Sequence, residues 1–287
     1  MNTSTVLERP EILEIKDEKL PIVGGAMPIE ALERHQSWVL EYNRDLEIQD
    51  GFRSDVIDGD WKPLVTKAKT LLEGYTGRMG IHGPFDGLLI ASWDAPVREF
   101  VRSRYLKALG FAEGLGASHM VMHSPFLYFG HAMVAHSEAH GLSDQIGWAH
   151  ETLNAVVTRA SEIGCQIVIE NIRDTNPRPL LELVKSFNSE FVRMSLDTGH
   201  ANLMHEIGAP TADQWVLDAG EYLGHVHLQD NDSQLDRHWH PGRGSINWYA
   251  VFKALETLKH KPRLILEVRD ADVMPAFDWL ASQAFVR

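Results

Sequence analysis

The 287-residue chain predicts an α/β protein, a single (β/α)8 or TIM barrel, from two features of its sequence. Short apolar runs alternate with longer amphipathic stretches to the end of the chain, and such runs are typical of buried parallel strands. Eight runs occur, and eight strand–helix units with right-handed crossovers close a barrel. An open doubly wound sheet is the alternative, but no Gly-rich dinucleotide motif follows the first run.

The predicted strands are short runs of mostly apolar residues. In chain order they are Ile22–Gly25, Leu46–Gln49, Arg78–His82, Ser118–His123, Gln166–Glu170, Val192–Leu196, Gly224–Leu228 and Arg263–Val268. Helices are predicted where apolar residues recur every three to four positions. They are Pro28–Tyr42, Asp60–Leu72, Ala95–Leu115, Ser143–Ile163, Pro179–Phe187, Thr211–Ala219, Asn247–Leu258 and Ala271–Ala281. Side chains suited to cap a helix N-terminus occur at Ser143, Thr211 and Asn247.

Composition and charge narrow the organisation and the partners of the chain. Hydrophobic residues make up 44% and charged residues 23%, an ordinary globular balance. We expect one barrel domain over residues 20–287 and an N-terminal extension over residues 1–19, which lacks the features of a signal peptide. The net charge of −13 opposes non-specific binding to nucleic acid or anionic membranes. No apolar run approaches the roughly 20 residues that cross a bilayer, so no membrane partner is expected.

Two other features have ordinary interpretations. Cys165 is the one cysteine, which excludes a disulfide within the chain and favours a cytoplasmic location. Its place beside an apolar run indicates a small buried hydrophobe rather than a nucleophile. The third predicted helix carries a basic cluster, which we interpret as an outer solvated face rather than a DNA patch. Its members are Arg98, Arg102, Arg104 and Lys107.

Two long connections follow predicted strands, and long loops in this position usually build or cover the site of a barrel. One is 124–142, and the other is 229–246. The first contains His131, His136 and His140, whose helix-like spacing indicates a solvated face more than a lid.

Histidines and carboxylates stand at the ends of six consecutive predicted strands. These residues are His82, His123, Glu170, Asp197, His227 and Glu267, with His200, Asp236 and His238 in the connections that follow. The carboxyl ends of all strands ring one mouth of a barrel. Several carboxylates in one cleft repel each other unless a cation neutralises them, and imidazole with carboxylate suits Zn, Mn, Fe or Co.

Each residue alone has a plainer interpretation, as a surface ion-pair partner or a histidine bonded to backbone. The joint pattern favours metal ligation by Glu170, Asp197, His227 and Glu267. For the other five residues, substrate contact competes with metal ligation. His225 shares a strand face with His227, and a packed core histidine is its favoured interpretation.

Five strings carry a resemblance to a known family: IEN, LDTGH, HVHLQD, DRHWHPGRGSINW (236–248) and ILEV. The chain resembles the xylose-isomerase-like barrel superfamily, which joins sugar isomerases and epimerases with the abasic-site endonucleases. In the epimerases, the residues matching Glu170, Asp197, His227 and Glu267 hold one metal, and the two glutamates are also the acid and base. The residue matching His200 and an arginine after the seventh strand contact the sugar, and Arg237 and Arg243 are candidates for that arginine.

The endonucleases of the superfamily hold three zinc ions with nine protein ligands. Each of these ligands has a residue of the same type in this chain, and the nine matching residues are those named above at the strand ends and in the following connections. The resemblance therefore implies one to three divalent ions, of Mn, Zn or Co. Asn171 and Arg269 directly follow ligands and are candidates, with the two arginines above, for substrate binding.

The leading hypothesis is a metal-dependent isomerase or epimerase of a sugar or sugar phosphate, in which Glu170 and Glu267 transfer protons through an enediolate. An abasic-site endonuclease is the alternative, followed by a dehydratase or lyase of the same superfamily and by a non-catalytic binding barrel. A homo-oligomer is compatible with the sequence, because such barrels often form dimers or tetramers.

Overall fold

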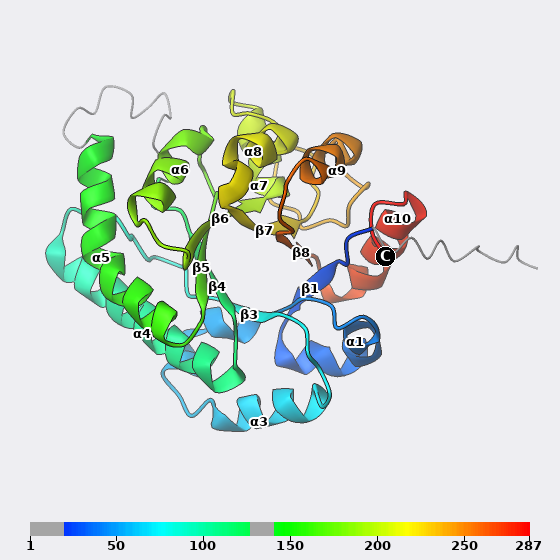
Figure 1. The fold of residues 1–287 in the computed structure, drawn as a ribbon, viewed down its shortest axis with the longest axis horizontal. Coiled ribbons are helices and arrows are strands. Elements are labelled where there is room, and N and C mark those ends of the chain that lie inside the picture. The colour runs from blue at the N-terminus through cyan, green and yellow to red at the C-terminus, as the bar shows by residue number, and fades with distance from the viewer. Residues whose placement is uncertain (1–19, 127–140) are drawn as a thin grey trace, which may run out of the picture.

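The computed structural model describes residues 20–126 and 141–287, and these form the predicted closed barrel of eight parallel strands (Figure 1). β1 pairs with β2 on one side and with β8 on the other, which closes the sheet. The strands are β1 Gly24–Met27, β2 Leu46–Ile48, β3 Met79–His82, β4 His119–His123, β5 Gln166–Glu170, β6 Val192–Asp197, β7 Leu223–Leu228 and β8 Arg263–Leu266. All eight strands lie within two residues of where the apolar runs predict them.

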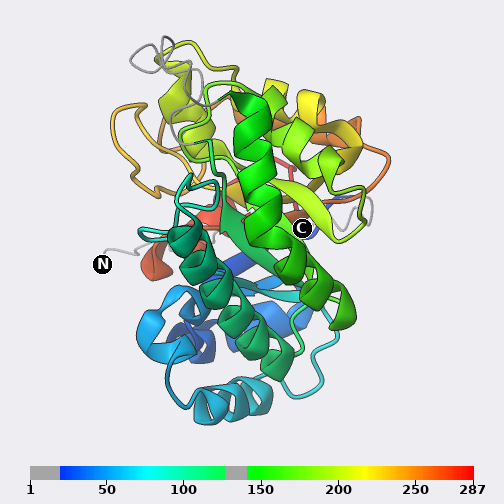
Figure 2. The same cartoon turned by 90° about the vertical axis from the view of Figure 1, so that its left-hand side faces the viewer.

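Helices surround the barrel and cover its outer face. The α-helices are α1 Ile29–Glu41, α2 Ser54–Ile57, α3 Lys62–Leu71, α4 Ala95–Leu115, α5 Leu142–Glu162, α6 Pro177–Ser186, α7 Thr198–His205, α8 Ala212–Ala219, α9 Trp248–Glu256 and α10 Val273–Ser282. The short 3-10 helices are η1 Gln49–Phe52, η2 Gly220–Tyr222 and η3 Asp270–Asp272. Figure 2 shows the two longest, α4 and α5, packed side by side along one flank.

The helix ends correct some of the predicted caps. The side chain of Asn247 caps α9 by accepting a hydrogen bond from the backbone N–H of Ala250 at 3.1 Å, as predicted. Thr211 stands at the N-cap of α8 but makes no capping hydrogen bond, and Ser143 lies inside α5, which begins after Gly141. Helix α7, whose N-cap is the carboxylate of Asp197, lies outside all the predicted helices.

The basic cluster on α4 is only partly the solvated face that the sequence predicts. Arg98 and Arg104 are buried, to 8% and 9% exposure, and they pair with Glu151 and Asp58 respectively. Arg102 pairs with Glu99 on the same helix, and Lys107 also binds Asp58. The side chains of Arg98 and Arg104 are buried, and the carboxylates of Glu151 and Asp58 compensate their charges. This cluster therefore stabilises the helix layer.

Several other predictions concern Cys165, two segments outside the described residues, and the character of the helices. Cys165 is buried, as predicted. His131, His136 and His140 lie outside the described residues, as does the predicted extension over residues 1–19. In the ranges that the structure describes, none of the helices has the length and apolar character needed to cross a membrane.

The closure of the barrel depends on a close backbone approach at Gly24. A Cβ atom on Gly24 would lie 1.7 Å from the backbone carbonyl oxygen of Asp45, which precedes β2. We predict that Gly24→Ala lowers the free energy of unfolding by about 3 kcal/mol or more, because the backbone cannot yield as a flexible side chain can. Urea denaturation followed by circular dichroism measures this change.

Gly110→Ala is the matched control for this substitution. Gly110 lies inside α4, and a Cβ there meets nothing within 4 Å. Because alanine favours the helix, this variant should be more stable by roughly 0.5–1 kcal/mol. A Gly24→Ala protein as stable as the parent would contradict the argument.

Candidate metal centre

The structure brings all nine predicted residues together at the carboxyl ends of β3 to β8. Their ligand atoms form three groups, and within each group these atoms lie within 4.8 Å of one another. The central group contains Glu170, Asp197, His227 and Glu267, as the sequence predicts. Nδ1 of His227 lies 3.3 Å from Oε1 of Glu170 and 3.4 Å from Oε2 of Glu267.

The central group has the donors and the burial that a cation site requires. Its three carboxylates are almost completely buried, with Glu170 at 1%, Asp197 at 0% and Glu267 at 8% exposure. Within the described ranges, Oε2 of Glu170 and Oδ2 of Asp197 have no hydrogen-bond partner. Buried carboxylate oxygens without partners are costly unless a cation binds them, so these residues fit a divalent metal.

Two further groups flank the central one. In the first, Nε2 of His82 and Nε2 of His123 lie 3.7 and 4.0 Å from Oε2 of Glu170, so that Glu170 belongs to two groups. In the second, Oδ2 of Asp236 lies 3.4 Å from Nε2 of His200 and 3.1 Å from Nε2 of His238. The three groups are adjoining candidate cation sites, and Glu170 belongs to two of them.

Backbone carbonyls orient three of the histidines. Nδ1 of His82 is 2.8 Å from the carbonyl oxygen of Gly83, Nδ1 of His200 is 3.0 Å from that of Asn171, and Nδ1 of His238 is 2.9 Å from that of Glu267. A carbonyl accepts only from a protonated nitrogen, so each Nδ1 carries a hydrogen. When such a ring is neutral, it presents the lone pair of Nε2 to its group, which is how metal-ligating histidines are usually held.

The charges of the cluster perturb one another strongly. Burial raises the pKa of Asp197 to about 7, and the nearby charges of Glu170 and Glu267 add to this effect. Burial disfavours the imidazolium of His238, but the hydrogen bond to Asp236 and the charge of Glu267 outweigh it and raise the pKa to about 9. The carboxylates around His227 likewise outweigh burial and raise its pKa well above the ordinary value. Protons and divalent cations therefore compete for this cluster.

Two buried amides support the cluster. Oδ1 of Asn171 accepts the backbone N–H of Asp197 at 2.7 Å, and its Nδ2 donates to the carbonyl oxygen of Asp197 at 3.2 Å. Nε2 of Gln229 donates to Asp197 at 3.1 Å and to Asp236 at 2.9 Å. A substrate-binding role for Asn171 stays a prediction. No role was predicted for Gln229 from the sequence. The signal for Gln229 was its place directly after the HVHL strand.

The three arginines predicted to bind substrate lie in the loops after β7 and β8. Arg237 forms an ion pair with Asp232 at 2.9 Å. The guanidinium of Arg243 lies over the ring of Trp239, 4.8 Å from its centroid, and the residue is exposed. Arg269 is exposed at the N-cap of η3. Their roles toward a substrate stay predictions.

A second layer of polar residues, not predicted from the sequence, lies beneath the mouth. Glu47 and His119 lie there beside His225, and all three are fully buried. The signal for Glu47 was a charge inside the apolar run Leu46–Ile48, and the signal for His119 was its spacing of four from His123 on one strand.

A surface hollow of about 300 Å³ lies at the opposite end of the barrel. Residues that precede β2, β3 and β8 line it, including Asp45, Arg78 and Lys261. The amino-terminal ends of barrel strands usually serve stability, and here the candidate metal ligands are at the other end. The hollow therefore lies apart from the candidate metal ligands at the mouth.

Comparison with known proteins agrees with this architecture. Residues 44–287 match the family model described as xylose isomerase-like TIM barrel. Uncharacterized protein MJ1311 of Methanocaldococcus jannaschii is 26% identical over 70% of this chain and 69% of its own. D-psicose 3-epimerase of Enterocloster bolteae is 29% identical over 30% of this chain and 26% of its own. A solved D-tagatose 3-epimerase-like protein superposes with a TM-score of 0.71 at 23% identity, covering 92% of this chain and 97% of its own.

We predict that the affinity of the chain for zinc rises with pH between about pH 6 and pH 9. Below its pKa of about 9, His238 carries a proton on the nitrogen that faces Asp236, and zinc must displace that proton. Isothermal titration calorimetry in buffers of different ionisation enthalpy measures both the affinity and the protons released.

Asp236→Asn is the control for this pH dependence. It removes the carboxylate that raises the pKa of His238, so the part of the pH dependence due to His238 should move to lower pH. Zinc affinity that stays constant across this range in the parent protein would contradict the prediction.

Proposed function

Because the chain belongs to the xylose isomerase-like TIM barrel family, we propose that it is a divalent-metal-dependent isomerase or epimerase of a sugar or sugar phosphate. The observation that carries the proposal is the central group, in which Glu170 and Glu267 both contact Nδ1 of His227, at 3.3 and 3.4 Å. The local similarity to an epimerase of Enterocloster bolteae supports the choice of reaction.

Glu170, Asp197, His227 and Glu267 would hold the metal in the central group. A Mn, Zn or Co ion bound there would supply Lewis acidity toward the carbonyl and neighbouring hydroxyl of a ketose. His200 lies at the edge of this group, with Nδ1 3.4 Å from Oε1 of Glu170, where it can contact the sugar.

The two glutamates move the proton. One carboxylate removes the proton from the carbon beside the carbonyl, and the other delivers a proton to a different carbon or to the opposite face of the same carbon. Burial raises the pKa of Glu170, but the charge of His227 and its histidine hydrogen bonds outweigh this and hold the pKa well below the ordinary value. Glu170 is therefore ionised at neutral pH, as a base must be.

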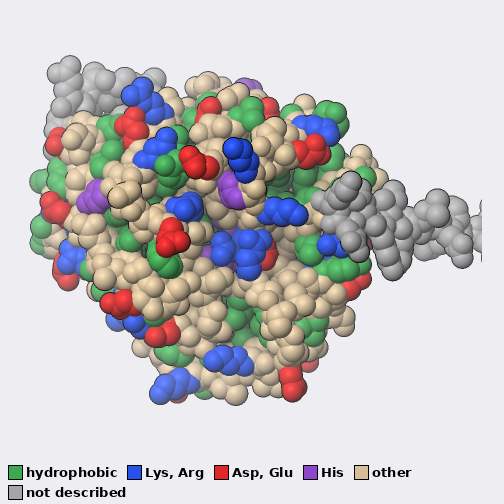
Figure 3. All heavy atoms as spheres, in the orientation of Figure 1, with side chains coloured by type: hydrophobic (Ala, Val, Ile, Leu, Met, Phe, Trp, Pro, Cys, Tyr) green, Lys and Arg blue, Asp and Glu red, His purple; other side chains and the backbone are tan. Residues whose placement is uncertain are grey.

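The substrate we propose is a small polar molecule. Arg243 is exposed in the loop after β7 and can bind a phosphate or carboxylate group of such a substrate. On the face drawn in Figure 3, several Lys and Arg side chains lie near the middle and most Asp and Glu side chains lie around them, while the chain as a whole carries a net charge of −13. This net negative charge favours a sugar over a long nucleic acid.

A second candidate is metal-dependent cleavage of a phosphodiester at an abasic site. The observation that favours it is the division of the nine residues into three adjoining groups, with Glu170 in two of them. Several cations close together can activate water and stabilise the leaving oxygen of a phosphodiester.

We predict that Glu170→Gln and Glu267→Gln each lower kcat on the preferred ketose by about 10²-fold or more, because an amide cannot exchange the substrate proton. A panel of ketoses and ketose phosphates, assayed by chromatography of the products, measures this loss. Glu73→Gln, which changes an exposed glutamate after α3, is the matched control and should leave kcat unchanged. Near-parental turnover in either active-site variant would exclude this mechanism.

The effect of His238→Ala on two activities separates the two candidates. We expect the isomerase to need only the central group, so His238→Ala should retain ketose turnover while its metal content falls. The endonuclease requires all three groups, so the same variant should lose cleavage of an abasic duplex. Cleavage of that duplex by the parent protein, without turnover of any ketose, would replace the proposed function by the second candidate.

A further inference from the structure

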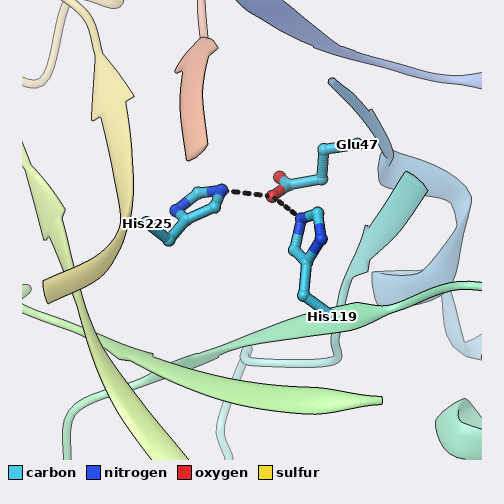
Figure 4. A group of neighbouring side chains, drawn as sticks. All are labelled: Glu47, His119 and His225. Atoms are coloured by element: carbon cyan, nitrogen blue, oxygen red, sulfur yellow. Dashed lines mark ion pairs between the residues drawn. The ribbon is translucent and has the colours of Figure 1, made fainter. Parts of the chain in front are cut away.

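A second cluster of metal-binding side chains lies inside the barrel beneath the mouth. Glu47 comes from β2, His119 from β4 and His225 from β7, and the three side chains point toward one another at the barrel axis (Figure 4). Each is 0% exposed. None of the three belongs to the groups at the mouth, although one oxygen of Glu47 reaches that layer.

The distances in this cluster suit one cation. Oε2 of Glu47 lies 3.1 Å from Nε2 of His225 and 3.6 Å from Nε2 of His119. Ligands about 2.0–2.1 Å from a tetrahedral zinc ion are separated by about 3.3 Å. Both distances from Oε2 of Glu47 are close to this value, and all three ligand atoms lie within 4.8 Å of one another.

The ligand atoms of this cluster make no hydrogen bonds within the described part of the chain. Oε2 of Glu47, Nε2 of His225 and both ring nitrogens of His119 lack a hydrogen-bond partner there. Four buried polar atoms without partners are costly in one small space, and a bound cation would satisfy three of them.

The charge of the cluster also requires compensation. Among the described residues, the ion-pair contacts of the Glu47 carboxylate are with the imidazoles of His119, His225 and His227. Arg263 donates instead to Gln166 and Ser118. A divalent cation beside Oε2 would offset the charge of this buried carboxylate.

Neighbouring residues are shaped around these histidines. Gly80 on β3 lies against the ring of His119, and a Cβ at Gly80 would come within 2.1 Å of it. Ser195 Oγ lies 2.8 Å from Nδ1 of His225 and can accept its hydrogen, which leaves a lone pair on Nε2. Ser195 reaches this position where the register of β6 against β7 shifts, between Met194 and Ser195.

We propose that Glu47, His119 and His225 form an additional, buried site for a zinc-like divalent transition metal, separate from the groups at the mouth. Two imidazoles and one carboxylate are a ligand set suited to zinc, and a trapped water can complete the tetrahedron. Oε1 of Glu47 accepts a hydrogen bond from Nε2 of His227 at 3.0 Å. The carboxylate thus joins the buried ion to a ligand of the central group. The proposed buried site does not depend on which reaction takes place at the mouth.

The decisive test is anomalous diffraction from crystals of the full chain grown with zinc chloride, at wavelengths on both sides of the zinc edge. We expect an anomalous peak bounded by Oε2 of Glu47 and by Nε2 of His119 and His225. Peaks at the mouth alone, or a density between these atoms without anomalous signal, would overturn the proposal. The second outcome would identify a water-filled hydrogen-bonded network.

Variants provide an independent measurement of the same ion. His119→Gln should lose about one equivalent of zinc and the lower anomalous peak while keeping the peaks at the mouth. His82→Gln, a matched change on the neighbouring strand, should keep the lower peak and disturb the mouth. Zinc content equal to the parent in folded His119→Gln would contradict the site.

A milder variant serves if His119→Gln does not fold. Ser195→Ala removes only the hydroxyl beside His225 and should weaken binding of the buried ion by about 10- to 100-fold. Competition with a zinc-sensitive chelator measures this affinity, and the wild-type protein is the reference. An unchanged set of zinc affinities in Ser195→Ala would count against the proposal.

Discussion

The mutual repulsion of buried carboxylates is the constraint on which the mouth of this barrel depends. Glu170, Asp197 and Glu267 are nearly inaccessible to water and have ligand atoms within 4.8 Å of one another and of His227. Such a group loses its hydration and gains repulsion, and nearby positive charge or protonation of a carboxylate offsets both. Protonated histidines provide that charge in part, which is why the pKa of His227 is raised. A divalent cation supplies it more completely and at a fixed place.

The barrel sets this constraint by its own geometry. Side chains two apart on a strand share a face, so a histidine at the mouth has a second inward position one layer below it. His123 stands four residues after His119, and His227 stands two residues after His225, so both strands carry imidazoles at two depths. Barrel interiors are usually filled by branched apolar side chains. In this barrel, polar side chains replace part of that apolar packing. Glycines such as Gly80, which have no Cβ, leave space for the imidazole rings.

The sequence predicted the fold well because the physical signal for buried parallel strands is local. Each strand is a short apolar run, and its ends shift by at most two residues in the structure. The errors arose where one residue serves two purposes. Asp197 ends β6 and also caps α7, so its interpretation as a ligand concealed the helix start. Arg98 and Arg104 appear solvated in the sequence, but acidic partners on other elements allow them to be buried.

The sequence by itself determined the strand order and the kinds of ligand at the mouth, because the residue after each apolar run must stand at the carboxyl end of a strand. It also contained the strings that identify the family. Only the tertiary structure decided how the nine residues divide into three groups, because that division depends on side-chain directions and on distances between strands far apart in the chain. Only the tertiary structure shows that Glu47, His119 and His225 lie together, because barrel closure places strands β2, β4 and β7 around one axis. No local sequence pattern encodes this arrangement.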